Sequence, residues 1–276
     1  MRRRKMLSIA CGFALLGLIG FGAKAPAQET SRGVVDQIRN RGVIRVGLSL
    51  FMPRAMQDKD GKLIGFDVDV ANKIAEDLGV KTELVLTPWD AIVPSLLHGK
   101  FDVIISGMII TPARNLSVNF TAPYITDGVG LAASKTLAAG FKEIEDFNKP
   151  GVKLAVRRGA APYIELIRKT FPRAAMIEFD DDDLALQEVL SGKAHAVLSG
   201  EPRPTFWCMD HPGAIFQPIH TPFSVNLRAL ALRKGDVDSL NFFNNWIMVR
   251  TQDGWIKERQ DYWFKGRQWA DLVPKR

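Results

Sequence analysis

Cysteine and histidine are scarce in this sequence, with two and four residues respectively among 276. The histidines show no spacing typical of metal ligands, so we predict no metal site. The chain also lacks a phosphate-binding glycine loop, a Gly-x-Ser-x-Gly turn and a catalytic Cys–His pairing. These absences argue against the enzyme classes that depend on such motifs, and we expect no cofactor.

Long hydrophobic runs are absent after residue 22. Before it, residues 2–5 (RRRK) are basic, residues 6–22 are apolar, and residues 25–27 (APA) fit a small-x-small cleavage site. The apolar run is shorter than the roughly 20 residues that a membrane-spanning helix needs. We expect residues 1–27 to be a cleavable signal peptide that sends the protein to the periplasm. An uncleaved anchor is the alternative.

Removal of this segment would change the charge and the cysteine content. Residues 1–27 hold five of the 37 basic side chains, which leaves 37 − 5 = 32 against 30 acidic ones, and the net charge falls from +7 to about +2. No basic stripe interleaved with aromatic residues remains, so we expect no nucleic-acid binding. Cys208 would be the only cysteine left, which excludes a disulfide within the chain.

Two segments of the chain resemble each other at an offset of 190 − 97 = 93 residues. Residues 97–107 are LHGKFDVIISG, and residues 190–200 are LSGKAHAVLSG. In each, an amphipathic segment ends at a glycine, the usual left-handed end of a helix, and a short apolar run then leads to Ser-Gly. Such a run indicates a buried parallel strand. We expect residues 42–46 and 151–156 to form the opening strand of each unit.

Helical segments alternate with these strands. Apolar residues recur every four positions from 66 to 78, and the aspartates at 181–183 precede another apolar segment, as suits a helix N-terminus. This alternation predicts two open α/β lobes. Ligands bind beyond the carboxyl ends of such strands, so Ser106-Gly107 and Ser199-Gly200 should face one another across a cleft. A duplicated scaffold with no function in the cleft is the alternative.

The C-terminal part returns with an apolar strand at residues 229–232, followed by helical segments around 240–249 and 254–262. An aromatic cluster lies here: Trp255, Tyr262, Trp263, Phe264 and Trp269. At this spacing we expect the cluster to pack against the first lobe rather than to bind a ligand.

Seven motifs follow one another along the chain: GFDVD at 65–69, WDAIVPSL at 89–96, GKFD at 99–102, GM at 107–108, TPAR at 111–114, FTAPY at 120–124 and YWF at 262–264. Together they resemble the family-3 periplasmic solute-binding proteins, the polar amino-acid receptors of ABC importers. The resemblance implies an α/β, two-lobed, periplasmic-binding-protein-like (type II) Venus-flytrap fold, with open sheets flanked by helices and two hinge strands. Lobe 1 would comprise residues 28–128 and 226–276, and lobe 2 residues 129–225.

The resemblance also implies a ligand-binding site. Phe51 corresponds to the aromatic lid over the ligand, Trp89 to a second aromatic wall, and Arg114 to the arginine that clamps the ligand's carboxylate. The other implied positions lie at a strand end of lobe 1 and at the start of a lobe-2 segment: Ser106, Gly107, Ile109, Gly159, Ala160 and Ala161. A guanidinium suits this role because its rigid fork of donors captures a carboxylate with two hydrogen bonds. A surface salt bridge is the alternative for Arg114.

The sequence departs from the family pattern at several contacts. Ile109 stands where Ser or Thr is usual, Ala160 and Ala161 stand where Ser/Thr-Thr is frequent, and Gly200 stands where an Asp normally pairs with the ligand's α-ammonium. A buried ammonium without a partner is costly. Either Glu201, one position along, takes this role as a further ligand-binding residue, or the ligand lacks the ammonium. A second anionic group on the ligand could use nearby arginines, although we favour solvated surface charges for all three: Arg54, Arg157 and Arg158.

The resemblance implies a periplasmic substrate-binding protein that captures an amino acid or related small carboxylate and delivers it to an ABC permease in the inner membrane. We expect a monomer that is not an enzyme. The alternative on the same scaffold is a cyclohexadienyl (prephenate/arogenate) dehydratase, which needs a general acid in the cleft. The comparable position here is Tyr163, and Glu165 lies two residues away. The sequence distinguishes neither import from sensing nor one solute from another.

Overall fold

One mixed sheet holds all the described strands except the short pair β2 and β3, and each half of it is built around parallel strands. The computed structural model describes residues 33–274, and within them the main path of the sheet is β4-β1-β5-β12-β7-β10-β8-β9. In the first half, β1 (Val43–Leu48) lies between β4 (Lys81–Leu86) and β5 (Val103–Ile109) and is parallel to both. All seven residues of β5 are buried, which confirms the predicted buried strand.

The second half repeats this arrangement. Strand β8 (Lys153–Arg157) lies between β9 (Ala175–Phe179) and β10 (Ala196–Gly200) and is parallel to both. The repeat seen in the sequence therefore corresponds to one structural unit used twice, with β5 and β10 as its equivalent buried strands.

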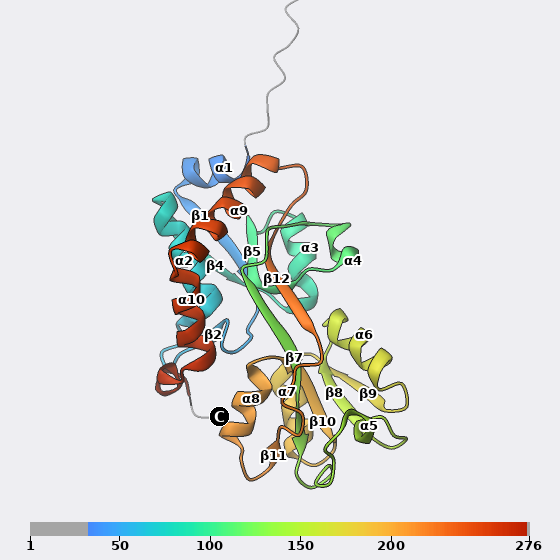
Figure 1. The fold of residues 1–276 in the computed structure, drawn as a ribbon. Coiled ribbons are helices and arrows are strands. Elements are labelled where there is room, and N and C mark those ends of the chain that lie inside the picture. Colours follow the sequence, from blue (N-terminus) through green and yellow to red (C-terminus); the bar gives the residue numbers. More distant parts are fainter. Residues whose placement is uncertain (1–32, 275–276) are drawn as a thin grey trace, which may run out of the picture. The chain divides into compact units, whose positions relative to one another are not determined.

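Helices lie between these strands, as the alternating pattern predicts. In the first half, α2 (Phe66–Leu78) ends at Gly79, which adopts φ 67°. In the second, α7 (Asp182–Leu190) begins after Asp181, whose carboxylate accepts a hydrogen bond from the backbone N–H of Leu184 at 2.8 Å. Each apolar face packs on its own half of the sheet and forms a lobe (Figure 1).

Two long strands join the lobes. Residues 125–128 of β7 (Ile125–Ser134) pair antiparallel with β12 (Val225–Leu232), and residues 129–133 pair with β10. Strand β12 also pairs with β5. Both strands run from one lobe toward the other in Figure 1. The two-lobed fold with two hinge strands is confirmed. The lobe boundaries predicted after residues 128 and 225 fall inside these strands and remain a prediction.

Shorter elements complete the two lobes. The remaining helices are α1 (Val34–Arg41), η1 (Trp89–Ala91), α3 (Ile92–Leu97), α4 (Pro112–Asn115), α5 (Ile144–Phe147), α6 (Ala161–Thr170), α8 (Arg203–Asp210), α9 (Val237–Gln252), α10 (Trp255–Gln260), η2 (Asp261–Lys265) and η3 (Gln268–Leu272). The remaining strands are β2 (Met56–Gln57), β3 (Leu63–Ile64), β6 (Asn119–Phe120) and β11 (Ile215–Phe216).

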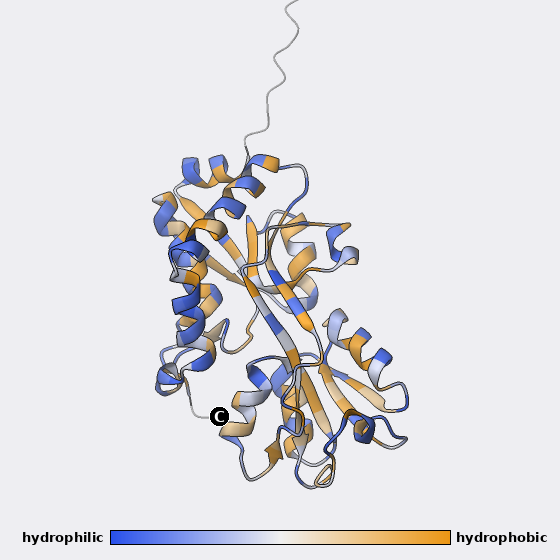
Figure 2. Ribbon diagram, viewed as in Figure 1, coloured by the Kyte–Doolittle hydropathy of each residue, from blue (hydrophilic) through white to orange (hydrophobic). Residues whose placement is uncertain are grey.

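The C-terminal aromatic cluster belongs to the core of the first lobe, as the sequence predicts. Trp263 and Trp269 are buried there with Phe66 of α2, and the other members of the cluster pack around them. The indole N–H of Trp263 donates to Asp69 at 2.6 Å, which satisfies its polar atom within the core. Figure 2 shows apolar residues concentrated in the strands and polar residues on the outer faces of the helices.

The predicted signal peptide, residues 1–27, lies outside the described residues. Within residues 33–274, every helix is too short or too polar to cross a membrane.

Candidate ligand-binding site

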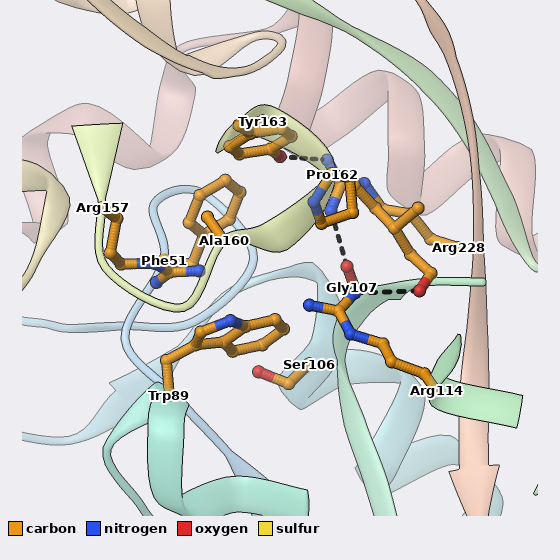
Figure 3. A pocket seen from close by; sticks show the side chains of 11 residues that line it. Phe51, Trp89, Ser106, Gly107, Arg114, Arg157, Ala160, Pro162, Tyr163 and Arg228 are labelled. Carbon is orange, nitrogen blue, oxygen red and sulfur yellow. Dashed lines mark hydrogen bonds between the residues drawn. The ribbon is translucent and has the colours of Figure 1, made fainter. Parts of the chain in front are cut away.

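A small pocket lies between the lobes, at the carboxyl ends of β5 and β8 (Figure 3). Its walls are Phe51, Trp89, Ser106, Gly107, Ile109, Arg114, Arg157, Ala160, Pro162, Tyr163 and Arg228. The space left inside is about 10 Å³, about enough for one water molecule. The lobes are therefore closed on one another, and a ligand larger than water must enter when they separate.

Arg114 points into this pocket from the short helix α4. Thr111 caps this helix by accepting a hydrogen bond from the backbone N–H of Arg114 at 3.1 Å, and the guanidinium donates to the carbonyl of Ile109 at 3.0 Å. Burial, together with the nearby charges of Arg228 and Arg157, lowers the pKa of this guanidinium to about 10. Arg114 is still charged at neutral pH, and it has free donors directed at the pocket.

Arg228 of β12 forms the wall beside it. Its guanidinium donates to the carbonyl of Gly107 at 2.6 Å, to the hydroxyl of Tyr163 at 2.9 Å and to Asp127 at 2.6 Å. Asp127 on β7 also accepts from Arg54 at 2.6 Å. One carboxylate therefore holds two arginines, and the contact with Tyr163 links β12 to the second lobe.

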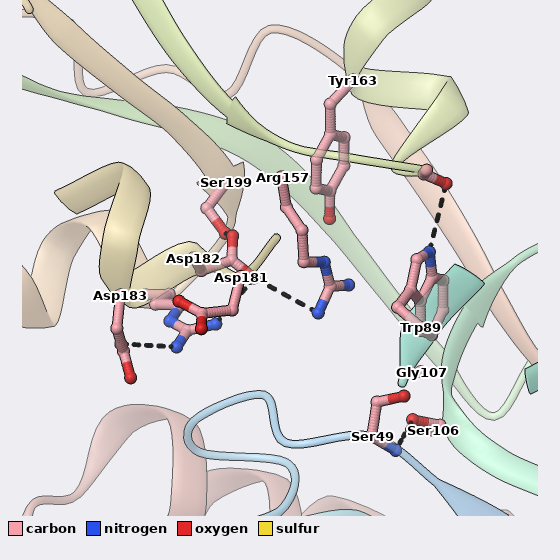
Figure 4. A network of polar contacts seen from close by, with 12 residues as sticks. Ser49, Trp89, Ser106, Gly107, Arg157, Tyr163, Asp181, Asp182, Asp183 and Ser199 are labelled. Atoms are coloured by element: carbon pink, nitrogen blue, oxygen red, sulfur yellow. Dashed lines mark hydrogen bonds and ion pairs between the residues drawn. The ribbon is translucent and has the colours of Figure 1, made fainter. Parts of the chain in front are cut away.

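Arg157 closes the opposite wall from the end of β8. Its Nη1 lies 3.3 Å from a carboxylate oxygen of Asp182, which also lies 3.0 Å from Nη1 of Arg203 (Figure 4). Asp182 in addition accepts a hydrogen bond from Ser199 at 3.1 Å. Burial lowers the pKa of Arg157, while Asp182 opposes this shift.

Gly107 makes room for the buried arginines. Its φ is +55°, a conformation that side chains rarely adopt, and a Cβ here would lie 2.7 Å from Cδ of Arg54. Its N–H donates to the hydroxyl of Tyr124 at 3.0 Å. A larger residue would displace Arg54 and the strand end that Arg228 holds.

Seven of the ten residues predicted for the site line this pocket: Phe51, Trp89, Ser106, Gly107, Ile109, Arg114 and Ala160. Gly159 lies just outside, where its carbonyl accepts a hydrogen bond from the indole of Trp89 at 3.2 Å. Ala161 is exposed at the start of α6.

The structure places Glu201 away from the pocket lining. Its carboxylate accepts hydrogen bonds from Thr205 at 2.8 Å and Gln217 at 2.7 Å, and burial raises its pKa. The side chain is thus held by α8 and the segment after β11 and does not line the pocket.

The surface interpretation of two arginines was wrong. Arg54 is 1% exposed and Arg157 6%, and each pairs with an aspartate whose side chain is at most 10% exposed. The interpretation as a surface charge is confirmed for Arg158, whose side chain is 59% exposed. Arg228 and Asp127 were not predicted from the sequence. The sequence nevertheless held a signal for these two residues. Charged residues inside short apolar strands are rarely buried without a partner, so each could have been expected to form an ion pair.

A larger cavity of about 630 Å³ adjoins the pocket and shares Trp89 and Arg157 with it. Its rim carries carboxylates, among them Asp90 and Asp180. Among residues 33–274, no group of three or more His, Cys, Asp or Glu side chains is arranged to hold a metal ion.

Two closed α/β lobes, two hinge strands and a charged pocket at the strand ends define a bilobed solute-binding protein. The sequence matches the model of the bacterial extracellular solute-binding proteins, family 3, over residues 44–266, and the chain belongs to this family. The resemblance inferred from the motifs is thereby confirmed.

The relatives span almost the whole chain. The L-cystine-binding protein TcyJ of Escherichia coli is 29% identical over 91% of this chain and 94% of its own length. Cyclohexadienyl dehydratase of Pseudomonas aeruginosa is 26% identical over 96% of both chains. A binding component of an ABC transporter from Wolinella succinogenes, solved in complex with lysine, is 38% identical with a TM-score of 0.78, over 84% of this chain and 99% of that one.

Proposed function

We propose that this chain is the substrate-binding protein of an ABC importer and captures an amino acid or related small carboxylate between its lobes. The observation that carries the proposal is the position of Arg114. Its guanidinium enters a pocket walled by both lobes, and within the described chain it donates a hydrogen bond to the backbone carbonyl of Ile109 rather than to a carboxylate. A charged donor in such a place suits a ligand's carboxylate. The names of the relatives support the same class of ligand.

Capture would proceed by closure of the lobes. The ligand first docks on lobe 1, with its carboxylate on Arg114 and its body against Trp89 and Phe51. Bending of β7 and β12 then brings Ala160 and Tyr163 of lobe 2 over it. Because only the closed state contacts the ligand from both sides, the ligand shifts the equilibrium between open and closed states. The lobe boundaries of this movement are residues 28–128 with 226–276, and 129–225.

The proposed route of the protein follows from its N-terminus. Residues 1–27 would direct it to the periplasm and be removed, and the closed monomer would then dock on a permease in the inner membrane. The same closure could serve a sensor. Neighbouring genes for a permease and an ATPase would favour import.

One comparison supports a second candidate, a dehydratase that acts on prephenate or arogenate, because a cyclohexadienyl dehydratase is similar to the chain over 96% of its length. This reaction needs a general acid, and no carboxylic acid is among the lining residues of the pocket in the described chain. Tyr163 lines the pocket, and Glu165 is exposed on α6. Turnover of prephenate, followed by absorbance, would support the enzyme. No turnover at high protein concentration would exclude it.

A thermal-shift screen of amino acids, keto acids and dicarboxylates tests the proposed function. A ligand present at 100 times its Kd should raise the free energy of unfolding by about 2.7 kcal/mol and the melting temperature with it. If no small carboxylate at millimolar concentration moves the melting temperature, the proposed function is contradicted.

A further inference from the structure

We infer that the ligand is a small dianion without an ammonium group, such as a dicarboxylate, and not a zwitterionic or cationic amino acid. This inference rests on the proposed function, because it names the ligand class of the same pocket. Four features of the site support it. They are the charges that line the pocket, the ion pairs of the buried arginines, the arginines close to the aromatic rings, and the space around Gly200.

The lining of the pocket is positively charged. Three guanidinium groups, those of Arg114, Arg157 and Arg228, contribute to its walls, and no Asp or Glu of residues 33–274 does so. The other polar side-chain groups in the lining are the hydroxyls of Ser106 and Tyr163 and the indole N–H of Trp89, and none of them is anionic. An ammonium group would enter this space next to three like charges and find no carboxylate, which is unfavourable in a site of low polarity.

The surrounding ion pairs do not neutralise this charge. Arg54 and Arg228 share Asp127, and Arg157 and Arg203 share Asp182. Arg203 also lies 3.1 Å from Asp183, and Arg114 forms no ion pair with any described carboxylate. Five arginines thus face three paired carboxylates, and 5 − 3 = 2 positive charges remain. A dianion supplies the missing two negative charges, whereas a zwitterion supplies none.

A fourth buried carboxyl group, that of Asp67, offers no partner to an ammonium in the pocket because it is not among the lining residues. Asp67 accepts a hydrogen bond from the hydroxyl of Tyr124 at 2.6 Å and forms no ion pair within the described chain. Burial raises its pKa, which disfavours its negative charge, although the nearby Arg54 opposes the shift.

The aromatic rings of the pocket lie close to the protein's own cations. The guanidinium carbons of four arginines lie 4.9 to 6.0 Å from the ring centroid of Phe51: Arg54, Arg157, Arg203 and Arg228. Those of Arg157 and Arg114 lie 4.6 and 5.6 Å from the ring of Trp89. Aromatic faces attract cations over such distances. A cationic side chain on the ligand would therefore compete with these arginines.

The guanidinium of Arg228 fills the space that a side chain at Gly200 would need. A Cβ at this position would overlap Nη2 of Arg228 and lie 2.6 Å from the hydroxyl of Tyr163. No acidic side chain can therefore be accommodated at the end of β10 without displacing this arginine. The space beside the end of β10 is therefore filled by the guanidinium of Arg228, and no carboxylate of the described chain is placed there to pair with an ammonium.

The adjoining cavity offers an ammonium only solvated carboxylates. Asp180 is paired with Arg158 at 3.0 Å, and both side chains are largely exposed. Asp181 caps α7, and Asp90 is exposed. Exposed carboxylates contribute little binding free energy because water screens them.

Isothermal titration calorimetry with matched acids tests the inference. We would compare glutarate with glutamate, valerate and norvaline, and repeat the comparison for four-carbon, six-carbon and aromatic skeletons. Lysine and arginine complete the panel. In the best-binding skeleton we expect the diacid to bind at least about tenfold more tightly than its amino derivative and its monoacid. We expect lysine and arginine not to bind.

The outcomes separate this inference from the proposed function. If an amino acid binds as tightly as, or more tightly than, its counterpart without the amino group, the ligand class is wrong and the proposed function stands. If no acid of any skeleton binds, both are wrong. In an Arg157→Gln variant, the affinity for the diacid should fall by a larger factor than the affinity for the monoacid. An equal loss for both acids would contradict a second anionic contact. Should this variant not fold, the panel on the unmodified protein decides.

Discussion

Gly200, the last residue of β10, occupies the point where two side chains from different parts of the chain meet. A Cβ there would overlap the guanidinium of Arg228 and contact the hydroxyl of Tyr163, whose hydrogen bond joins β12 to the second lobe. The smallest possible enlargement at this position should therefore separate the two groups.

We predict that Gly200→Ala lowers the free energy of unfolding by about 1–3 kcal/mol, the usual cost of overpacking a buried site. Urea denaturation followed by circular dichroism measures it. Gly213→Ala is the matched control, because nothing lies within 4 Å of a Cβ at that position and its backbone needs no glycine. Equal stability of the two variants would contradict the packing described around Arg228.

Individual site residues could be predicted from the sequence only where they lie within or next to a recognisable motif. Arg114 follows a recognisable strand end, and it lines the pocket. Arg228 has no such motif, and it lies about 100 residues along the chain from its partner Asp127. Arg54 and Arg157 looked like surface charges because their aspartate partners are distant in sequence.

At the scale of elements, β7 and β12 carry both the covalent connection between the lobes and a buried ion pair. Asp127 on β7 binds Arg228 on β12 and Arg54 of the first lobe, at 2.6 Å in each case. Removing one partner of a buried pair leaves an uncompensated charge, which costs more than the pair itself contributes.

We predict that Asp127→Asn lowers the free energy of unfolding by about 3–5 kcal/mol, as measured by chemical denaturation. Asp261→Asn is the matched control, since Asp261 also bridges two cations, Lys257 and Lys265, but its side chain is 42% exposed. Its replacement should have a much smaller effect. A loss for Asp127→Asn no larger than for the control would show that the shared carboxylate is not structurally important.

The elements themselves were predictable because their signals are local. The apolar run of β5 and the four-residue periodicity of α2 can be seen within a dozen residues, and both elements form where expected. The antiparallel pairing of β7 with β12 joins residues such as Gly128 and Val225. No local pattern encodes that partner, and the two hinge strands came only from the resemblance to the family.

At the scale of the whole molecule, the lobes are in contact around a space of about 10 Å³. The indole of Trp89 and the guanidinium of Arg228 each hydrogen-bond to lobe 2, at 3.2 and 2.9 Å. A small acid needs several times that space, so ligand entry requires the lobes to separate.

We predict that the ligand-free protein in solution has a larger radius of gyration than the ligand-bound protein, as measured by small-angle X-ray scattering. The tightest-binding acid of the screen should reduce the radius, because it is contacted from both sides only in the closed state. An acid that does not bind serves as the control. An unchanged radius in the presence of saturating ligand would contradict closure around the ligand.

Calorimetry on Arg114→Ala, with the tightest-binding acid of the screen, tests most directly whether Arg114 holds the ligand's carboxylate. We predict an affinity loss of about 1.5–3 kcal/mol, the contribution of a hydrogen bond to a charged group. Arg39→Ala, an exposed arginine on α1, should bind like the unmodified protein. An Arg114→Ala variant that is folded and binds the acid with unchanged affinity would remove Arg114 from the site and contradict the account.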